Sequence, residues 1–525
     1  MIFVKPLYII LLIIAGTLVH SLAHAENSHD LQFKVTRFEI QGDNPLTARQ
    51  VHAVLDPFLG EHAGLEGLQA ATDAFEQALR SSGFAFHQVN LPPQSLDQGT
   101  VRLEVVAVEL GAIIVEGNEH FSDENIRASL PQLKPEIRNI NTQSLGRSLA
   151  LANRHPGKKV RLNFAAGTQP GTVDARIRVK DQNPLRVFSW LDNTGNKETG
   201  NTRLGAGMQH SNLFGRDQIA TLTYTTSPEG VDKVSQFGGQ YQIPFYGAGG
   251  LLDIFAAKSE IDSGTVAEVF EVAGKGTVLG ARYTHFFSKQ KRYSHEMALS
   301  VTDKLFENDV DFQGVPVGVD VRTRPMELRY SGRWQGDLTN AGVYMGYARN
   351  LPGGSNNNAK AYAASRSGSD NNWSVLHIGG KLNRALQGWN VLGRFDAQYA
   401  SVPLVAGEQL GLGGANSVRG LEEREISGDR GYRVGMELWS PTLKKTGLRA
   451  LSFFEGGRIT LKNPLPGEIA TEKVASVGLG LRWSWQNRLS LRLDWGRILN
   501  GTDAANKTGS KSGDSKVHFN LGYRF

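Results

Sequence analysis

Arg419 is the residue whose type and position most suggest a specific interaction in this chain. It lies in the tetrapeptide Val418-Arg419-Gly420-Leu421, within the long connection between two strand-like segments, 391–402 and 431–439. A guanidinium group carries a planar fork of donors that fits a carboxylate with two hydrogen bonds. Loops of this length in compact domains commonly act as lids or binding loops. A loop arginine is also often simply solvated, so the elements around it must decide between the two interpretations.

The first 25 residues predict export from the cytoplasm. Lys5 supplies a positive start, 7–19 form an apolar stretch, and Ala23-His24-Ala25 matches a cleavage site, the pattern of a secretory signal peptide. The alternative, a membrane-anchoring helix, needs about 20 apolar residues, more than this stretch contains. After Ala25 no apolar run is long enough to cross a bilayer as a helix, so any membrane insertion must use another structure.

Composition excludes several classes of protein. The chain has no cysteine, which excludes a disulfide framework and thiol chemistry. The formal charge of +6 is small and dispersed over 525 residues, so we expect no nucleic-acid partner. We find no G-x-S-x-G, H-E-x-x-H or Walker A motif, and therefore expect neither an enzyme nor a cofactor or metal site.

Two small mixed modules are predicted before residue 184. In the first, 33–40 form a strand, 46–59 and 65–83 form helices, and 84–91 and 100–107 form two further strands. The second module repeats the order β-α-α-β-β. Its predicted elements are a strand at 113–115, a helical stretch after 117–122, a helix at 144–153, and strands at 160–164 and 173–179.

From Leu185 onward the pattern changes to about sixteen alternating segments, each near the roughly 9–11 residues that a tilted membrane strand needs. Tight turns such as Gln486-Asn487 alternate with three long, solvated connections, 353–372, the loop with Arg419, and 500–516. The last strand is the clearest, because apolar residues occupy every second position up to the end: Val517, Phe519, Leu521, Tyr523 and Phe525. The alternative, a soluble β-sandwich or propeller, would not need this asymmetry of loop lengths.

Together these segments resemble the outer-membrane two-partner secretion transporters (TpsB family, of the haemolysin secretion/activation ShlB/FhaC/HecB type), within the POTRA-plus-barrel superfamily. The resemblance rests on Val418–Leu421 and on two longer patterns, 81–106 and 151–181. It implies an α+β periplasmic part of two tandem POTRA domains, followed by a 16-stranded antiparallel transmembrane β-barrel. We expect a signal peptide at 1–25, POTRA 1 at 26–108, POTRA 2 at 109–183, and the barrel at 184–525 with a lumen loop at 404–430.

The resemblance also implies a role for Arg419, which in this family pairs with an acidic residue on the barrel wall. The family's wall motif, Phe-x-acid-x-Gly, is matched by Phe453, Glu455 and Gly457, although the family more often has aspartate at the acidic position. Asp494 is a second candidate, because the apolar residues of its strand point the other way. We expect Val418, Arg419, Gly420 and Leu421 to hold the resting conformation.

Two further sites follow from the resemblance. Phe84, Phe86, Gln88 and Val89, with the helix at 65–81, are candidates for a groove that captures the exported chain as an added strand. Their plain alternative is packing in the module core. The carboxy-terminal Tyr523 and Phe525 resemble a signal read during barrel assembly.

The family often has an amino-terminal helix that plugs the barrel. Only 26–32 precede the first predicted strand, so we expect no plug here. The expected function is export of a large partner exoprotein with an amino-terminal secretion domain (an adhesin, haemolysin or toxin). The expected partners also include outer-membrane lipid and, during biogenesis, barrel-assembly machinery and periplasmic chaperones. The alternatives are an outer-membrane assembly factor of the same superfamily and a passive porin.

Overall fold

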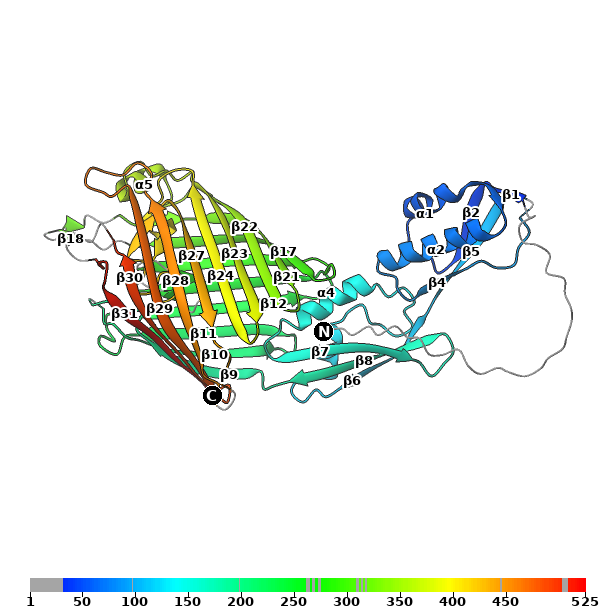
Figure 1. Cartoon of the computed structure of the whole chain (residues 1–525), viewed down its shortest axis with the longest axis horizontal. Coiled ribbons are helices and arrows are strands. Elements are labelled where there is room, and N and C mark those ends of the chain that lie inside the picture. Colours follow the sequence, from blue (N-terminus) through cyan, green and yellow to red (C-terminus); the bar gives the residue numbers. More distant parts are fainter. Residues whose placement is uncertain are drawn as a thin grey trace. The chain divides into compact units, whose positions relative to one another are not determined.

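The computed structural model describes residues 32–525 except 97, 198, 261–264, 267–269, 272–274, 308–310, 313–314, 317–318, 444–445 and 503–508. The predicted signal peptide and residues 26–31 lie outside the described residues. The chain forms two compact units: residues up to Arg154 with Lys158–Asp181, and His155–Gly157 with Gln182–Phe525 (Figure 1). None of the helices in the described part combines the length and apolar content that crossing a bilayer requires.

The first module packs helices on one face of a three-stranded sheet. The sheet order is β2-β5-β4, with β2 parallel and β4 antiparallel to β5, while β1 and β3 pair separately. The elements are β1 (Gln32–Val35), β2 (Arg37–Gly42), α1 (Ala48–Leu55), a 3-10 turn (Asp56–Phe58), β3 (Gly60–Ala63), α2 (Glu66–Ser81), β4 (His87–Asn90) and β5 (Thr100–Ala107).

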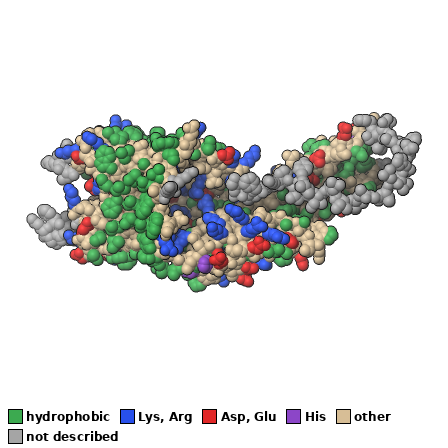
Figure 2. Space-filling model, turned by 60° about the horizontal axis from the view of Figure 1, so that its bottom comes forward, with side chains coloured by type: hydrophobic (Ala, Val, Ile, Leu, Met, Phe, Trp, Pro, Cys, Tyr) green, Lys and Arg blue, Asp and Glu red, His purple; other side chains and the backbone are tan. Residues whose placement is uncertain are grey.

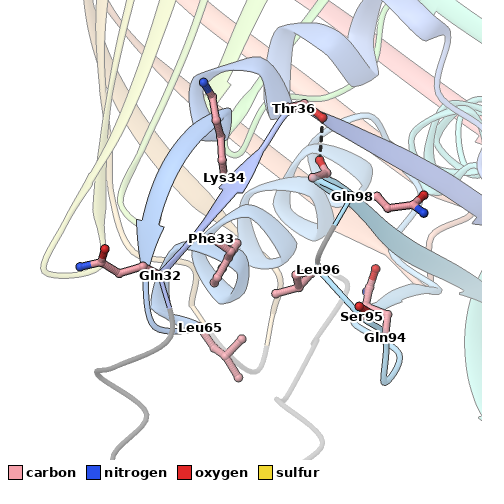
Figure 3. Close-up of a pocket in the computed structure, with 10 residues that line it drawn as sticks. Gln32, Phe33, Lys34, Thr36, Leu65, Gln94, Ser95, Leu96 and Gln98 are labelled. Carbon is pink, nitrogen blue, oxygen red and sulfur yellow. Dashed lines mark hydrogen bonds between the residues drawn. The ribbon is translucent and has the colours of Figure 1, made fainter.

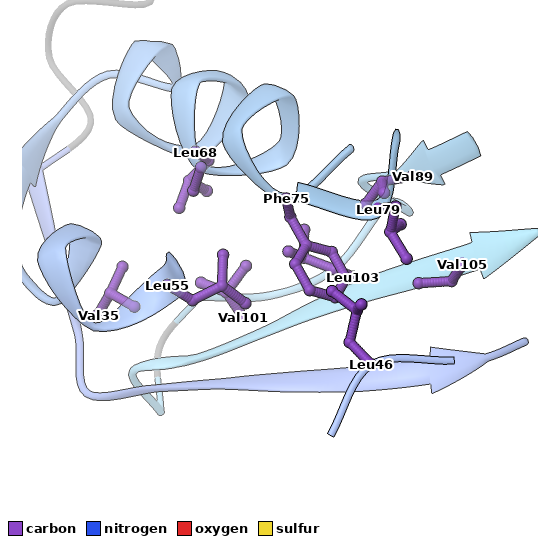
Figure 4. Close-up of a cluster of buried hydrophobic side chains, with 11 residues drawn as sticks. Val35, Leu46, Leu55, Leu68, Phe75, Leu79, Val89, Val101, Leu103 and Val105 are labelled. Carbon is purple, nitrogen blue, oxygen red and sulfur yellow. The ribbon is translucent and has the colours of Figure 1, made fainter. Parts of the chain in front are cut away.

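The core of this module lies between α2 and β5. Every second side chain of β5 is buried, and Phe75 and Leu79 of α2 pack against them (Figure 4). This is the pairing that the two periods require, because a strand buries alternate residues and a helix buries positions three and four apart. The members of the core are Val35, Leu46, Leu55, Leu68, Ala71, Phe75, Leu79, Val89, Val101, Leu103 and Val105.

Three details of the predicted module were wrong. The strand expected at 33–40 divides at Thr36, whose N–H and hydroxyl both donate to Gly99 O, at 2.7 and 2.9 Å. The helix expected at 46–59 ends at Leu55, before Pro57, and β3 was not predicted. The strand expected at 84–91 is only β4, because Phe84 N caps α2 by donating to Leu79 O at 2.8 Å, and the chain turns before His87.

The second module has the predicted order of elements. Its sheet order is β6-β8-β7, with β6 parallel and β7 antiparallel to β8. It contacts the first module where Thr142 N and Oγ1 donate to Gly83 O at 2.7 and 2.8 Å. The elements are β6 (Glu109–Glu116), α3 (Asp123–Ala128), α4 (Thr142–Ala152), β7 (Lys158–Ala166) and β8 (Thr172–Asp181).

In the described chain sixteen antiparallel strands close into a barrel, as predicted, because β31 pairs with β9. β20 and β21 form one strand interrupted at Arg324, and both pair with β17. The segments are β9 (Leu185–Asp192), β10 (Arg203–Leu213), β11 (Gln218–Thr226), β12 (Gln236–Phe245), β13 (Gly250–Ser259), β16 (Gly276–Phe286), β17 (Tyr293–Phe306), β20 (Val321–Thr323), β21 (Pro325–Gln335), β22 (Thr339–Asn350), β23 (Ser374–Leu386), β24 (Trp389–Ala400), β27 (Arg430–Trp439), β28 (Arg449–Thr460), β29 (Thr471–Trp485), β30 (Leu489–Asn500) and β31 (Ser515–Arg524).

The outer face of the barrel is apolar. Figure 2 shows hydrophobic side chains gathered over its strands, and large apolar residues such as Leu222, Leu279, Met436 and Leu479 are exposed there. The last strand follows the same rule, since Val517 is exposed whereas His518 is buried. Closure and an apolar exterior are what a strand structure needs in lipid, where no unpaired backbone group is tolerated.

Loop lengths differ between the two ends of the barrel. Short turns lie at the end where β9 begins. In one of them Gln486 and Asn487 have φ of 50° and 56°, the positive values that the two central residues of a type I′ turn adopt, and Arg488 N donates to Trp485 O at 3.0 Å. The longer connections at the other end include the small hairpins β14 (Thr265–Val266) with β15 (Phe270–Glu271) and β18 (Asp311–Phe312) with β19 (Val315–Pro316). The expectation that 353–372 is a solvated loop was wrong, because it forms α5 (Ala359–Ser365), whose Tyr362 is fully buried.

Candidate functional site

The connection between β24 and β27 is a folded insertion. After β24 it forms a 3-10 turn (Ala406–Glu408) and a small antiparallel pair, β25 (Leu410–Leu412) with β26 (Ile426–Gly428). Val418, Arg419 and Leu421 are all fully buried. The solvated alternative for Arg419 is therefore excluded, and the loop lies inside the barrel against its wall.

Arg419 binds carboxylates on three wall strands at once. Its Nε and Nη2 donate to Glu455 of β28 at 3.0 and 2.7 Å, and its backbone N–H donates to the same carboxylate at 2.9 Å. Nη1 donates to Asp494 of β30 at 3.1 Å, and Nη2 also donates to Glu437 of β27 at 2.5 Å. The guanidinium carbon lies 3.5 Å from the centre of the Phe453 ring. Glu455 and Asp494, proposed as alternatives, are both partners.

Three more arginines complete the network, and sequence reasoning missed them. Arg394 donates to Glu455, while Arg482 and Arg492 donate to Asp494 at 3.0 and 2.8 Å. Because Glu455 and Asp494 are fully buried, these pairs offset the cost of removing their charge from water. Arg492 and Asp494 are two residues apart and therefore lie on the same face of β30. This spacing of opposite charges could have been recognised in the sequence.

Glycines allow the loop backbone to touch the wall. Gly420 has φ of +103°, a conformation that other residues rarely adopt. A Cβ on Gly496 of β30 would lie 2.7 Å from both Arg419 C and Gly420 N, and a Cβ on Gly457 would lie 2.7 Å from Leu412 Cδ1. The glycine that ends the Phe-x-acid-x-Gly motif is therefore small because two neighbours approach it: the loop, and Tyr432 O of β27, which would lie 2.6 Å from its Cβ.

Apolar packing and one histidine fix the rest of the loop tip. Val418 and Leu421 belong to a buried cluster shared with the wall, and Gly420 N donates to His518 Nε2 of β31 at 3.0 Å. The loop is thereby attached to both β30 and the last strand of the barrel. The cluster, hereafter the tip cluster, consists of Leu412, Val418, Leu421, Ile426, Ile459, Val474 and Ile498.

Comparison with known proteins identifies the family. The model described as haemolysin secretion/activation protein ShlB/FhaC/HecB matches residues 171–483, and the ShlB-type POTRA model matches 33–107. The chain belongs to the ShlB/FhaC/HecB family. It is accordingly an outer-membrane protein with its POTRA domains in the periplasm.

Relatives of this family member include transporters. The outer membrane transporter CdiB-2 of Burkholderia pseudomallei is 20% identical over 445 residues, covering 82% of this chain and 74% of the relative. The heme/hemopexin transporter protein HuxB of Haemophilus influenzae is 24% identical over 193 residues, 36% of this chain. That match spans about a third (34%) of HuxB.

Solved structures support the fold assignment. CdiB from Escherichia coli has a TM-score of 0.73 at 18% identity, and CdiB from Acinetobacter baumannii 0.70 at 17%; each comparison covers 96% of this chain and 93% of the other. BamA from Haemophilus ducreyi lacking POTRA domains 1–3 has a TM-score of 0.50 at 15% identity, covering 94% of this chain and 100% of the other.

Glu455, at the acidic position of the Phe-x-acid-x-Gly motif, makes hydrogen bonds that depend on the length of its side chain. Its longer arm lets one carboxylate accept from the side chain and the backbone N–H of Arg419 and from Arg394. We expect Glu455→Asp, which shortens the arm by one methylene, to keep only part of these bonds and to lower export severalfold, about 1 kcal/mol for each lost bond. Export assayed beside Glu455→Gln tests this, since normal export by Glu455→Asp with a loss only in Glu455→Gln would mean that charge and not reach matters.

The candidate groove residues of POTRA 1 do not share one surface. Val89 is a core residue and Phe84 packs against the core, whereas Gln88 is exposed. Phe86 contacts Phe164 of the second module, with ring centroids 4.7 Å apart. The plain alternative of core packing therefore describes two of the four, and capture at this strand remains a proposal.

A hollow on another face of POTRA 1 was not anticipated. It has a volume of about 740 Å³ and lies between β1 and residues 94–96 and 98–99 (Figure 3). Its labelled side chains combine the apolar Phe33, Leu65 and Leu96 with three glutamine amides. The sequence prediction missed this hollow because it merged β1, which lines the hollow, with β2 into one strand.

The carboxy-terminal residues lie at the closure of the barrel. Tyr523 pairs with Ser189 of β9, and Phe525 N donates to Val187 O at 3.0 Å. The Tyr523 and Phe525 rings contact each other edge to face at 4.7 Å, and Phe525 is exposed. An aromatic pair at the seam, with Tyr523 half-buried and Phe525 exposed, is compatible with the predicted assembly signal, which stays a prediction.

Proposed function

We propose that the chain is a translocation pore that exports one large partner exoprotein from the periplasm to the cell surface. The observation that carries this proposal is the lumen loop, bound to the wall of a closed barrel through Arg419. A permanently open channel has no use for a folded insertion with buried, paired charges. A pore that must stay closed between transport events does.

In this proposal the POTRA domains recognise the amino-terminal secretion domain of the partner. The lumen loop holds the resting state and shifts when the unfolded partner enters. Folding of the partner outside the cell biases the movement outward, so no nucleotide, metal or enzymatic step is needed. During its own biogenesis the barrel is delivered by periplasmic chaperones and inserted by the barrel-assembly machinery.

A second candidate function is assembly of other barrels. The likeness to BamA, with a TM-score of 0.50, favours it less than the likeness to CdiB at 0.73 favours transport. Both functions use POTRA domains and a barrel, so fold alone does not separate them.

Deletion of the gene in its host separates the two. We expect one large secreted protein to disappear while the outer-membrane protein profile is unchanged, measured by comparing both fractions with those of the parent strain. Broad depletion of other barrels, with secretion unchanged, would instead identify an assembly factor.

A further inference from the structure

A second buried ion pair lies at the root of the lumen loop, away from Arg419. Asp429, the residue before β27, is fully buried and accepts two hydrogen bonds from Arg366, at 2.6 and 3.0 Å. It also accepts from Leu404 N at 2.7 Å, Lys462 N at 2.7 Å and Gln409 Nε2 at 3.2 Å. One carboxylate thus joins both ends of the lumen loop to the β28–β29 connection and to the residue that ends α5.

The segment that carries Arg366 folds into the mouth of the barrel. Tyr347 and Tyr399 are exposed on the outer face, so their neighbours Ala348 and Ala400 point inward. Tyr362 of α5 packs against these inward positions. The buried cluster, hereafter the mouth cluster, consists of Val321, Ala348, Tyr362, Trp373, Val375, Ala400, Leu404 and Val405.

Internal bonds make this segment a defined element. Asn350 Nδ2 donates to Asn357 Oδ1 and Asn371 O at 2.8 and 2.7 Å, which ties the two ends of the connection together. The Tyr362 hydroxyl donates to Arg322 O at 3.3 Å and accepts from Trp373 at 3.2 Å. Burial raises the pKa of Tyr362, so its hydroxyl stays neutral at all physiological pH values. Residues 351–373, hereafter the mouth segment, are therefore held in a fixed conformation over the mouth of the barrel.

The contacts of the mouth segment differ from those of the loop tip. The mouth cluster and the tip cluster have no member in common. Their carboxylates also differ, since Arg366 binds Asp429 whereas Arg419 binds Glu455, Asp494 and Glu437. The two sets of contacts therefore share no ion-pair partner and no buried cluster residue, although both are made to the lumen loop.

We propose that Arg366 and Asp429 form a second latch, which holds the mouth segment across the extracellular end of the lumen and opens independently of the Arg419 latch. The inference rests on the proposed function, since it assigns this pore two gates in series. Arg366 and Asp429 are positioning residues that act through the mouth segment.

Two independent gates in series have a measurable signature. The pore conducts only when both are open, so the open probability is the product of the two separate probabilities. We expect Arg366→Gln to raise the leak about tenfold, because it removes one partner of a buried pair. The double variant Arg366→Gln/Arg419→Ala should then show about the product of the two single increases, as independent sites do.

The leak is measured as conductance of the full-length protein in planar bilayers, which needs no partner protein. Arg433→Gln is the matched control, since Arg433 binds Asp396 at 2.8 Å on the same wall without contacting the mouth segment. Arg366→Lys keeps the charge without the fork and should leak less than Arg366→Gln. A leak in Arg366→Gln no greater than in Arg433→Gln overturns the latch, and a double variant no leakier than its leakier single member overturns independence.

A second measurement follows the mouth segment directly. The chain lacks cysteine, so Ala361→Cys on α5 introduces a single, buried thiol. We expect a membrane-impermeant maleimide added outside intact cells to label it about tenfold faster with Arg366→Gln but at the original rate with Arg419→Ala. Equal acceleration by both variants would mean one concerted gate. Failure of the gene-deletion experiment would leave both measurements intact, so the two proposals fail separately.

Discussion

Replacing Arg419 with alanine should abolish most export while the barrel still inserts into the outer membrane. Arg419 makes five hydrogen bonds to Glu455, Asp494 and Glu437, four from its guanidinium and one from its backbone N–H. Removing one partner of a buried charge network costs roughly 3–5 kcal/mol. Because that energy holds a loop and not the strand ladder, the loss should fall on the resting conformation of the lumen loop, from which the proposed transport cycle starts, and not on the fold.

The measurement is the amount of partner protein in the medium, which we expect to fall more than about tenfold given this energy. Resistance of the barrel to unfolding in detergent gels serves as the control for insertion, and Arg433→Gln as the control for a generic loss of a wall arginine. Full export by Arg419→Ala would show that the network is structural only.

Gly496→Ala should reproduce this phenotype without changing any charge. Its new Cβ would lie 2.7 Å from Arg419 C and Gly420 N, distances at which backbone atoms must move apart. The strand itself tolerates alanine, so the movement falls on the loop tip and misaligns Arg419 with its carboxylates. We expect export to drop about tenfold or more, since small misplacements of buried polar groups forfeit their hydrogen bonds.

Gly393→Ala is the matched control for this prediction. A Cβ at Gly393 of β24 would have only Leu382 Cβ nearby, at 3.9 Å, which is ordinary contact. It should therefore export at the parental level. If Gly496→Ala also exports normally, contact between the loop tip and β30 is not needed for the resting state.

Local pattern was sufficient for the class of fold and for the main residue of the site. Alternation in the segments after Leu185 predicted strands of membrane length, because period two sets which face each residue occupies without reference to distant parts, and the family resemblance implied their closure into an antiparallel barrel. The order of helices and strands predicted two POTRA domains for the same reason. Arg419 was identified from its loop and the resemblance of Val418–Leu421.

The set of charged residues that contact Arg419 could not be deduced from local pattern. Its partners Glu455 and Asp494 lie 36 and 75 residues away, and strand stagger and closure bring them to one point in the lumen. The sequence marked both carboxylates as candidates for the lumen but could not show that they act together, or that Glu437 and three arginines join them. Alternation determines the face of a side chain, whereas barrel closure determines its neighbours.

The same distinction explains the errors in the front module and the mouth segment. Thr36 divides β1 from β2 through bonds to Gly99, which lies 63 residues later. Arg366 meets Asp429 across another 63 residues, in a segment whose polar composition resembles that of any solvated loop. Polar residues that form buried networks have no local signature, because their partners come from other strands. The sequence therefore specifies strands, faces and the arginine of the loop, and closure of the barrel specifies which charges meet.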